Sequence, residues 1–363
     1  MKRALLTFII LVLVSNALFA SITFSGSARL RPRYDLIINK TGDQSTHSGD
    51  IYFQYRAKLN IHGSLGDNFY FKGQISHNSP ANWSKMGDGS DLPSASSDAS
   101  GQSPSIAFTE INLGYKGEKW AYKLGRFSYG HNTLLDIHYY PTKLVDIPFF
   151  IFNNNAITGA ELSYNFNKHY LKAALSIDEN HINYQNFIDA EVDSVVYDQE
   201  GITAMFNAGL KFDNIKINPS FLISGGKSMS NPITAGVVAQ YAPSGLLLKA
   251  EAAYSVSDHA KDLYAYNGMI LRTEVRKKIG MGTLRLMYDH SRMSYSRFNG
   301  QNYATSQSGI YHYTWLEYTM PLFKSEFGSV VLRPVWRCYY SRMEATDKEY
   351  TRHKIELFLQ YTF

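Results

Sequence analysis

Apolar and polar residues alternate with a period of two along most of this chain. Near its end, Ile355 and Leu357 alternate with Lys354 and Glu356, and the pattern continues to Phe363. Because successive side chains of a strand point to opposite faces, the alternation predicts a strand with one apolar and one wetter face. An unpaired terminal edge invites aggregation, so a soluble protein rarely ends on an exposed Phe after such a strand.

The same alternation recurs throughout the sequence, and we interpret about sixteen segments as strands. These segments lie near residues 21–34, 51–62, 69–77, 106–115, 120–126, 156–165, 169–178, 201–212, 215–224, 232–241, 246–255, 268–278, 283–290, 309–320, 329–341 and 351–363.

The links between these segments alternate between short and long. Short, turn-rich links occur at Asp213 and Asn214 and around Met281, for example. The long links are residues 35–50, 79–105, 127–155, 179–200, 225–231, 256–267, 291–308 and 342–350. A soluble β-sandwich is the alternative fold, but it has no reason to alternate its loops in this way.

The alternation and the terminal Phe363 resemble bacterial outer-membrane β-barrels, in which a terminal aromatic residue is the family's assembly signal. The resemblance implies an all-β, transmembrane, antiparallel up-and-down barrel over residues 21–363, with short periplasmic turns and long extracellular loops. It also implies location in the bacterial outer membrane as a passive channel, and it admits a homotrimer. The implied partners are outer-membrane lipid, lipopolysaccharide and the barrel-assembly machinery, which would read the strand that ends at Phe363.

A shorter resemblance lies at Leu124-Gly125-Arg126, just before the link at residues 127–155. It is similar to the Gly-Arg step of alginate-export-like and related substrate-specific porins. The strongly acidic constriction loop of general-diffusion porins is not evident here.

The beginning of the chain predicts a secretory signal peptide at residues 1–20. Lys2 and Arg3 precede an apolar segment at residues 4–14, and small residues lead to a cleavage site after Ala20. An uncleaved helical anchor is the alternative.

Composition agrees with a barrel. The chain has a mean hydropathy of -0.26 but carries 27 Tyr, 21 Phe and 4 Trp. Polar lumen-facing residues offset the apolar lipid-facing ones, and aromatic residues ring both interfaces of such barrels. After the first twenty residues, no run of about eighteen apolar residues predicts a membrane-spanning helix.

Basic residues gather on one face of several predicted strands. A charged side chain that faces lipid costs about 2–4 kcal/mol near the midplane, so these residues are expected to face the lumen. A first group lies on the strands that closure brings together, and it comprises Arg29, Arg31, Arg33, Arg56, Lys58, Lys72, Arg333, Arg337 and Lys354. A second group comprises Arg272, Arg276, Lys278 and Arg285.

Fewer acidic residues are expected on the same face: Glu110, Glu161, Asp178, Glu251, Glu274, Asp289, Glu317 and Glu356. Pairing between these acids and neighbouring bases would leave a positive lumen that favours anions. The alternative is that the arginines are only solvated scaffolding of the wall.

The link at residues 127–155 is a candidate constriction loop. Its polar candidates are Asp136, His138, Lys143 and Asp146, and it also holds the apolar run 147–152. A water-exposed loop would not normally carry such a run, so we expect it to pack on the inner wall or on a neighbouring barrel. Alternatively, residues 147–152 form an extra strand.

Sequence signals for catalysis or metal binding are weak. The tripeptide at residues 226–228 lacks the first Gly of a phosphate-binding loop, and Asp88, Asp91 and Asp98 lack calcium-loop spacing. His290 and Ser291 beside Asp289 are the place to look for a hydrolase, although neighbouring strand residues face opposite ways. We expect no enzymatic activity, cofactor, metal or nucleic-acid partner.

The sequence thus predicts a porin for small hydrophilic solutes with anion preference. One alternative is a channel specific for an anionic sugar, in which inward tyrosines stack on sugar rings. These tyrosines are Tyr52, Tyr70, Tyr311, Tyr313 and Tyr339. Another alternative is a structural or adhesive barrel without a pore.

Overall fold

The structure, a computed structural model, describes ten segments of the chain. These are residues 20–66, 68–77, 83–86, 106–128, 156–177, 201–226, 232–257, 264–298, 303–343 and 347–363. No helix among them is long and apolar enough to cross a membrane. The predicted signal peptide, apart from Ala20, and most of the candidate constriction loop lie outside the described residues, so both remain predictions.

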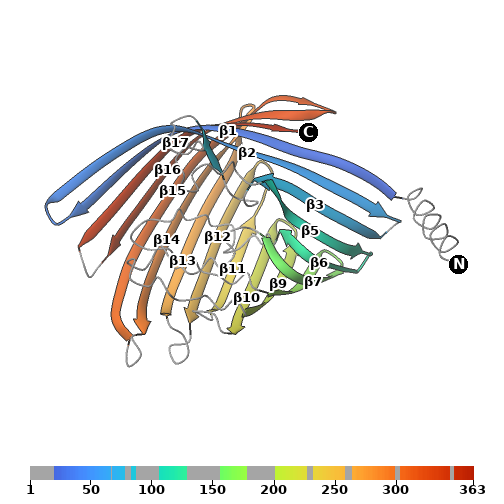
Figure 1. The fold of residues 1–363 in the computed structure, drawn as a ribbon, viewed down its shortest axis with the longest axis horizontal. Helices are drawn as coiled ribbons and strands as arrows, with labels where there is room; N and C mark the ends of the chain where they lie inside the picture. Colours follow the sequence, from blue (N-terminus) through green and yellow to red (C-terminus); the bar gives the residue numbers. More distant parts are fainter. Residues whose placement is uncertain are drawn as a thin grey trace, which may run out of the picture.

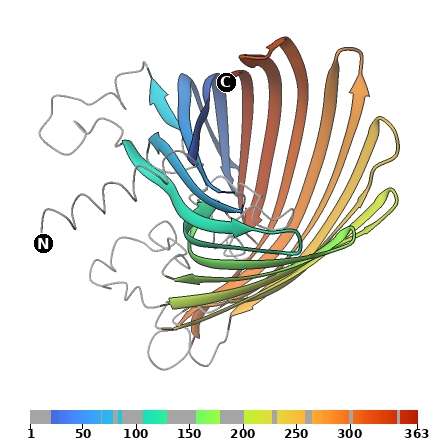
Figure 2. The same ribbon diagram turned by 90° about the vertical axis from the view of Figure 1, so that its right-hand side faces the viewer.

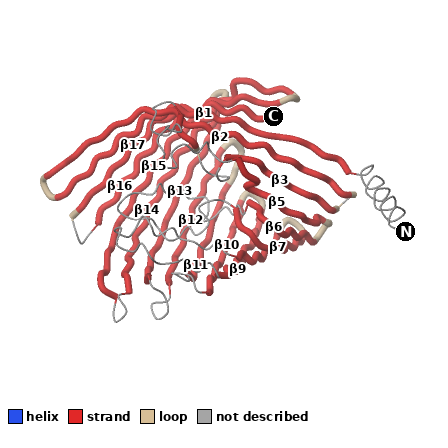
Figure 3. Tube along the Cα trace, in the orientation of Figure 1, coloured by secondary structure: helices blue, strands red, loops and turns tan. Residues whose placement is uncertain are grey.

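The described residues form strands joined by tight turns (Figure 3). The strands are β1 (Ala20–Thr41), β2 (Gln44–Leu65), β3 (Phe69–His77), β4 (Ser84–Met86), β5 (Ile106–Lys116), β6 (Trp120–Ser128), β7 (Ala156–Phe166), β8 (His169–Ile177), β9 (Gly201–Phe212), β10 (Ile215–Gly226), β11 (Pro232–Tyr241), β12 (Leu246–Ser257), β13 (Tyr264–Ile279), β14 (Gly282–Phe298), β15 (Tyr303–Ser325), β16 (Gly328–Met343) and β17 (Lys348–Thr362).

Sixteen of these strands close into an antiparallel barrel, in which each strand pairs with its neighbours along the chain. The first and last strands also pair, with Leu30 opposite Leu359 and Arg33 opposite Glu356. Figures 1 and 2 show β1 and β17, the two ends of the barrel sequence, side by side. In the part of the chain that the structure describes, the sheet closes on itself, which confirms the predicted up-and-down barrel.

The alternation in the sequence becomes an inner and an outer face of this wall. On β1, Phe24 and Leu30 are exposed on the outer face, whereas Arg31 and Arg33 are buried on the inner face. On β17, Ile355 and Leu357 are exposed and Glu356 is buried. An apolar exterior around a polar interior is the arrangement that a membrane-spanning barrel requires.

The first link differs from its prediction. Residues 35–50 were expected to form a long loop, but β1 and β2 pair as far as Thr41 opposite Gln44. The turn at Gly42 and Asp43 is tight, and Gly42 has a left-handed φ of 56°. Residues 41–50 are all exposed, so both faces of this ribbon are polar and its sequence loses the alternation that marks a strand.

The expected alternation of short and long links is therefore wrong at the first link. Three later links are also shorter than expected, because β13 and β15 begin at Tyr264 and Tyr303 and β17 begins at Lys348. The long extracellular loops expected elsewhere lie largely outside the described residues.

The short strand β4 continues the line of β3 along β2. β3 pairs with β2 only as far as Ser76 opposite Lys58, and β4 pairs farther along the same edge, with Lys85 opposite Gln54. This strand was not predicted. It brings Trp83, the residue before β4, against the inner face of β1 and β2.

Candidate functional site

The first predicted basic group lies on the inner face of β16, β17, β1, β2 and β3. Strand register places Arg29 opposite both Arg56 on β2 and Gln360 on β17. On the other side of β17, Arg337 lies opposite Lys354. We call this surface the basic wall, and it comprises Arg29, Arg31, Arg33, Arg56, Lys58, Lys72, Arg333, Arg337, Arg352 and Lys354.

Glu356 is the centre of the buried half of the basic wall. Its carboxylate contacts Arg31 Nη1 at 3.2 Å and Arg33 Nη2 at 2.5 Å, and it also pairs with Arg337. The four side chains are almost fully buried. Buried guanidinium groups need such hydrogen-bonded partners, so Glu356 compensates charges from both neighbouring strands.

Asp35 forms a second buried acidic centre. Arg352 Nε donates to Asp35 Oδ1 at 2.7 Å, and Arg352 Nη2 donates to Oδ2 at 2.5 Å. The Tyr52 hydroxyl also donates to Asp35, at 2.9 Å, and accepts from Arg33 Nη1 at 2.9 Å. Sequence reasoning missed Arg352 and Asp35. Arg352 could have been found, because it lies two residues before Lys354 on β17 and therefore on the same face of the strand.

Other cations of the basic wall remain more accessible. Arg29, Arg56 and Lys58 are partly exposed on the inner face. The Lys72 side chain is 41 % exposed although its Nζ contacts Glu110 Oε2 at 2.9 Å. Water therefore reaches the inner face on this side of the barrel.

The second predicted basic group is balanced by acids. Arg272 donates to both carboxylate oxygens of Asp289, at 2.6 and 2.8 Å, and contacts Glu251 at 3.5 Å. Arg276 and Arg285 both pair with Glu274, with Arg285 at 2.9 Å. This part of the wall carries little net charge, so the two groups predicted together are electrostatically different.

The Trp315 side chain lies between the basic wall and the second basic group. The Trp315 ring lies 4.9 Å from the Arg285 guanidinium carbon and 4.7 Å from that of Arg337, within cation–π range. Trp315 Nε1 donates to Glu317 at 3.2 Å.

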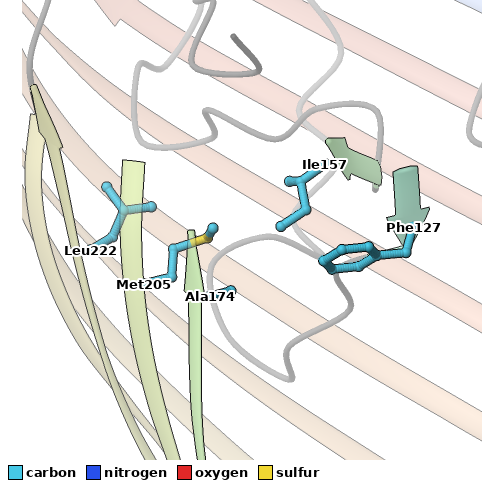
Figure 4. Packing of buried hydrophobic residues seen from close by; sticks show 5 residues of the cluster. All are labelled: Phe127, Ile157, Ala174, Met205 and Leu222. Carbon is cyan, nitrogen blue, oxygen red and sulfur yellow. The ribbon is translucent and has the colours of Figure 1, made fainter. Parts of the chain in front are cut away.

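The inner face on the other side of the barrel is partly apolar. Five buried side chains on β6 to β10 form a cluster, shown in Figure 4: Phe127, Ile157, Ala174, Met205 and Leu222. Charged side chains also lie on this side of the barrel, where Glu161 pairs with Lys123 at 3.2 Å and with Lys172 at 3.6 Å.

The remaining sequence candidates do not form a site among the described residues. Asp136, His138, Lys143 and Asp146 lie outside them, as do Asp178 and the aspartates Asp88, Asp91 and Asp98, which lack calcium-loop spacing. Asp289 and Ser291 are buried on the inner face, whereas His290 lies on the outer face, where its ring centroid is 5.0 Å from that of His312. Within the described part of the chain, no group of three potential ligands is placed to hold a metal ion.

No family model matches the chain, and no curated protein matches it in sequence. Solved structures do match its fold. The outer-membrane channel DcaP of Acinetobacter baumannii is 14% identical with a TM-score of 0.56, over 95% of this chain and 97% of that one. An anion-selective porin from Comamonas acidovorans is 12% identical with a TM-score of 0.54, over 95% and 100%. OmpT of Vibrio cholerae, in a trimer form, is 11% identical with a TM-score of 0.55, over 95% and 99%.

The chain has the fold of the bacterial outer-membrane porins. In a barrel with the porin fold, the exposed apolar residues form the surface toward lipid, and the basic wall lies inside. The fold and the apolar exterior together make this a β-barrel of the bacterial outer-membrane type.

Proposed function

We propose that this protein is a porin of the bacterial outer membrane that lets small hydrophilic solutes diffuse passively, with a preference for anions. The observation that carries the proposal is the charge imbalance of the basic wall, whose ten cations outnumber the four acids that pair with them, Asp35, Glu110, Glu317 and Glu356. Rings and rows of Arg or Lys raise the local concentration of anions in a pore. The balanced group around Glu274 and Asp289 contributes little to this preference.

Water access to the inner face supports a channel over a closed structural barrel. Besides Lys72, the Arg276 side chain is 44 % exposed, and Arg333 and Arg285 are partly exposed. We infer that the loop at residues 127–155 narrows the pore, with Asp136, His138, Lys143 and Asp146 as its polar residues.

The second candidate function, a channel specific for an anionic sugar, has less support. Stacking on a sugar requires exposed aromatic faces. Tyr52, Tyr311, Tyr313 and Tyr339 are only 5%, 1%, 4% and 4% exposed. Tyr70 alone among the five predicted tyrosines is more than marginally accessible, so a stacking ladder is not favoured.

We further propose a homotrimer, a state that OmpT of Vibrio cholerae adopts in its trimer form. The barrel-assembly machinery would read the strand that ends at Phe363, and lipid and lipopolysaccharide would contact the outer face. Enzymatic activity is not part of the proposal, because His290 points away from Asp289 and Ser291.

Reversal potentials in planar bilayers test this function. In a KCl gradient the wild type should conduct and prefer chloride, and the double variant Arg29→Gln, Lys58→Gln should lose much of that preference. Arg276→Gln is the matched control, because it removes an inner-face cation that is paired with Glu274. A cation-selective or non-conducting wild type would contradict the proposal.

A further inference from the structure

The basic wall contains two kinds of cation, and they lie in different places. Around Glu356 and Asp35 the guanidinium groups are buried in ion pairs. In contrast, Arg29 and Lys58 form no ion pair or side-chain hydrogen bond with any residue that the structure describes. Both are partly exposed and belong to the region nearer the turn between β2 and β3.

Strand register brings further cations close to Arg29 and Lys58. Arg29 lies opposite Arg56 on β2, and Lys58 follows two residues later on the same face. On the other side of Arg29 lies Gln360, whose side-chain oxygen accepts a hydrogen bond from Arg333. Paired side chains of neighbouring strands are about 5 Å apart, so these cations fit around one small ligand. Arg333 also forms an ion pair with Glu317, at 4.0 Å.

Trp83 forms one border of this cluster. Its ring centroid is 3.9 Å from the Arg31 guanidinium carbon and 4.9 Å from that of Arg56, and Phe358 packs against it at 5.6 Å. Arg31 belongs to the buried Glu356 group, whereas Arg56 faces Arg29. The indole thus lies between Arg31 of the Glu356 group and Arg56, and it holds the Arg56 guanidinium plane in place.

The geometry points to a discrete binding site for small doubly charged oxyanions, formed by Arg29, Arg56, Lys58 and Arg333 and positioned by Trp83. Guanidinium forks bind carboxylate, sulfate or phosphate oxygens in pairs, and charge-assisted bonds of this type are about twice as strong as neutral ones. A dianion engages two or more of the cations at once, whereas chloride engages them singly. This inference rests on the proposed function, because the ligand must enter through the channel.

Saturable block of the chloride current by sulfate tests the site. Sulfate should reduce the wild-type current along a saturating curve, and Arg29→Gln should raise the half-blocking concentration about tenfold, as the loss of one charge-assisted bond predicts. Arg276→Gln, the control on the balanced wall, should shift it by less than about twofold. Current that falls linearly with sulfate, or an equal shift in both variants, would overturn the site in favour of a diffuse field.

The role of Trp83 has a separate test. Trp83→Leu removes no charge, so it should leave the reversal potential in KCl unchanged while it raises the half-blocking sulfate concentration. Trp83→Phe, which keeps a ring, should restore most of the block. Unaltered sulfate block in a folded Trp83→Leu protein would overturn the positioning role.

These experiments distinguish a failure of the proposed anion preference from a failure of the proposed dianion site. Saturable sulfate block without chloride preference would contradict the proposed anion-selective porin while supporting the site. Chloride preference without saturable block would contradict the site alone. Heat-modifiable gel mobility verifies that each variant is folded before it is measured.

Discussion

Gly26 and Phe363 exchange two backbone hydrogen bonds. Gly26 N–H donates to the Phe363 carbonyl at 2.9 Å, and Phe363 N–H donates to the Gly26 carbonyl at 3.1 Å. A Cβ on Gly26 would lie 2.6 Å from the Phe363 ring and 2.6 Å from the Lys58 carbonyl oxygen. The final residue therefore completes the seam between the first and last strands, and it needs a glycine opposite to do so.

Gly26→Ala should weaken this seam. The new methyl group would push against backbone as well as the ring, and overpacking of this kind costs about 1–3 kcal/mol. Urea unfolding of the refolded protein in vesicles measures the loss of unfolding free energy. Gly225→Ala is the matched control, since a Cβ there meets nothing within 4 Å. Equal stability of the two variants would contradict the close approach at the seam.

Deletion of Phe363 should leave a protein that inserts poorly, because both seam hydrogen bonds are lost. The fraction of protein with heat-modifiable mobility in outer-membrane preparations reports folding. Phe363→Tyr keeps the backbone and the ring and should fold like the parent. A deletion variant with parental folded yield would show that the terminal residue does not direct assembly.

Glu356→Gln should destabilise the folded barrel. It removes the carboxylate that pairs with the buried Arg31, Arg33 and Arg337, and breaking a buried pair costs about 3–5 kcal/mol. Urea unfolding in vesicles measures the loss of unfolding free energy. The control is Glu349→Gln, whose partner Lys40 lies 3.9 Å away and is exposed, so this change should cost less than about 1 kcal/mol. A Glu356→Gln protein as stable as the control would show that the arginines do not need this carboxylate.

Removal of residues 134–146 should raise single-channel conductance while the barrel stays folded, because the loop at residues 127–155 is proposed to narrow the pore. Planar-bilayer recordings measure it. Conductance equal to that of the parent would place this loop outside the conduction path.

The alternating parts of the strands could be predicted closely from the sequence, and the strand extensions without alternation could not. Where the outer face of the barrel is apolar, a strand must alternate apolar and polar residues, and β7, β9 and β11 accordingly begin and end within a residue or two of their predicted bounds. Strand residues beyond this apolar surface need no alternation of apolar and polar side chains. The polar ribbon near Gly42 and the brief strand β4 therefore carried no alternation to recognise.

The inward direction of the arginines followed from the same alternation, but their partners did not. Glu356 contacts Arg31 and Arg33 only because β17 pairs with β1 in one register, and Arg337 because β16 is its other neighbour. Such pairing depends on closure geometry. The contacts of Trp83 with the basic wall could not be predicted either, because the link that contains Trp83 shows no alternation typical of a strand.

Moving one charge across the wall tests the central claim, that the cations face the lumen, most directly. The double variant Ala57→Lys, Lys58→Ala shifts an ammonium by one residue, from the inner to the outer face, with composition unchanged. A lysine toward lipid costs about 2–4 kcal/mol near the midplane, so refolding yield into lipid vesicles should fall sharply, while Lys58→Ala alone should refold like the parent. Equal yields for the two variants, or a lower yield for Lys58→Ala, would contradict a lumen-facing basic wall.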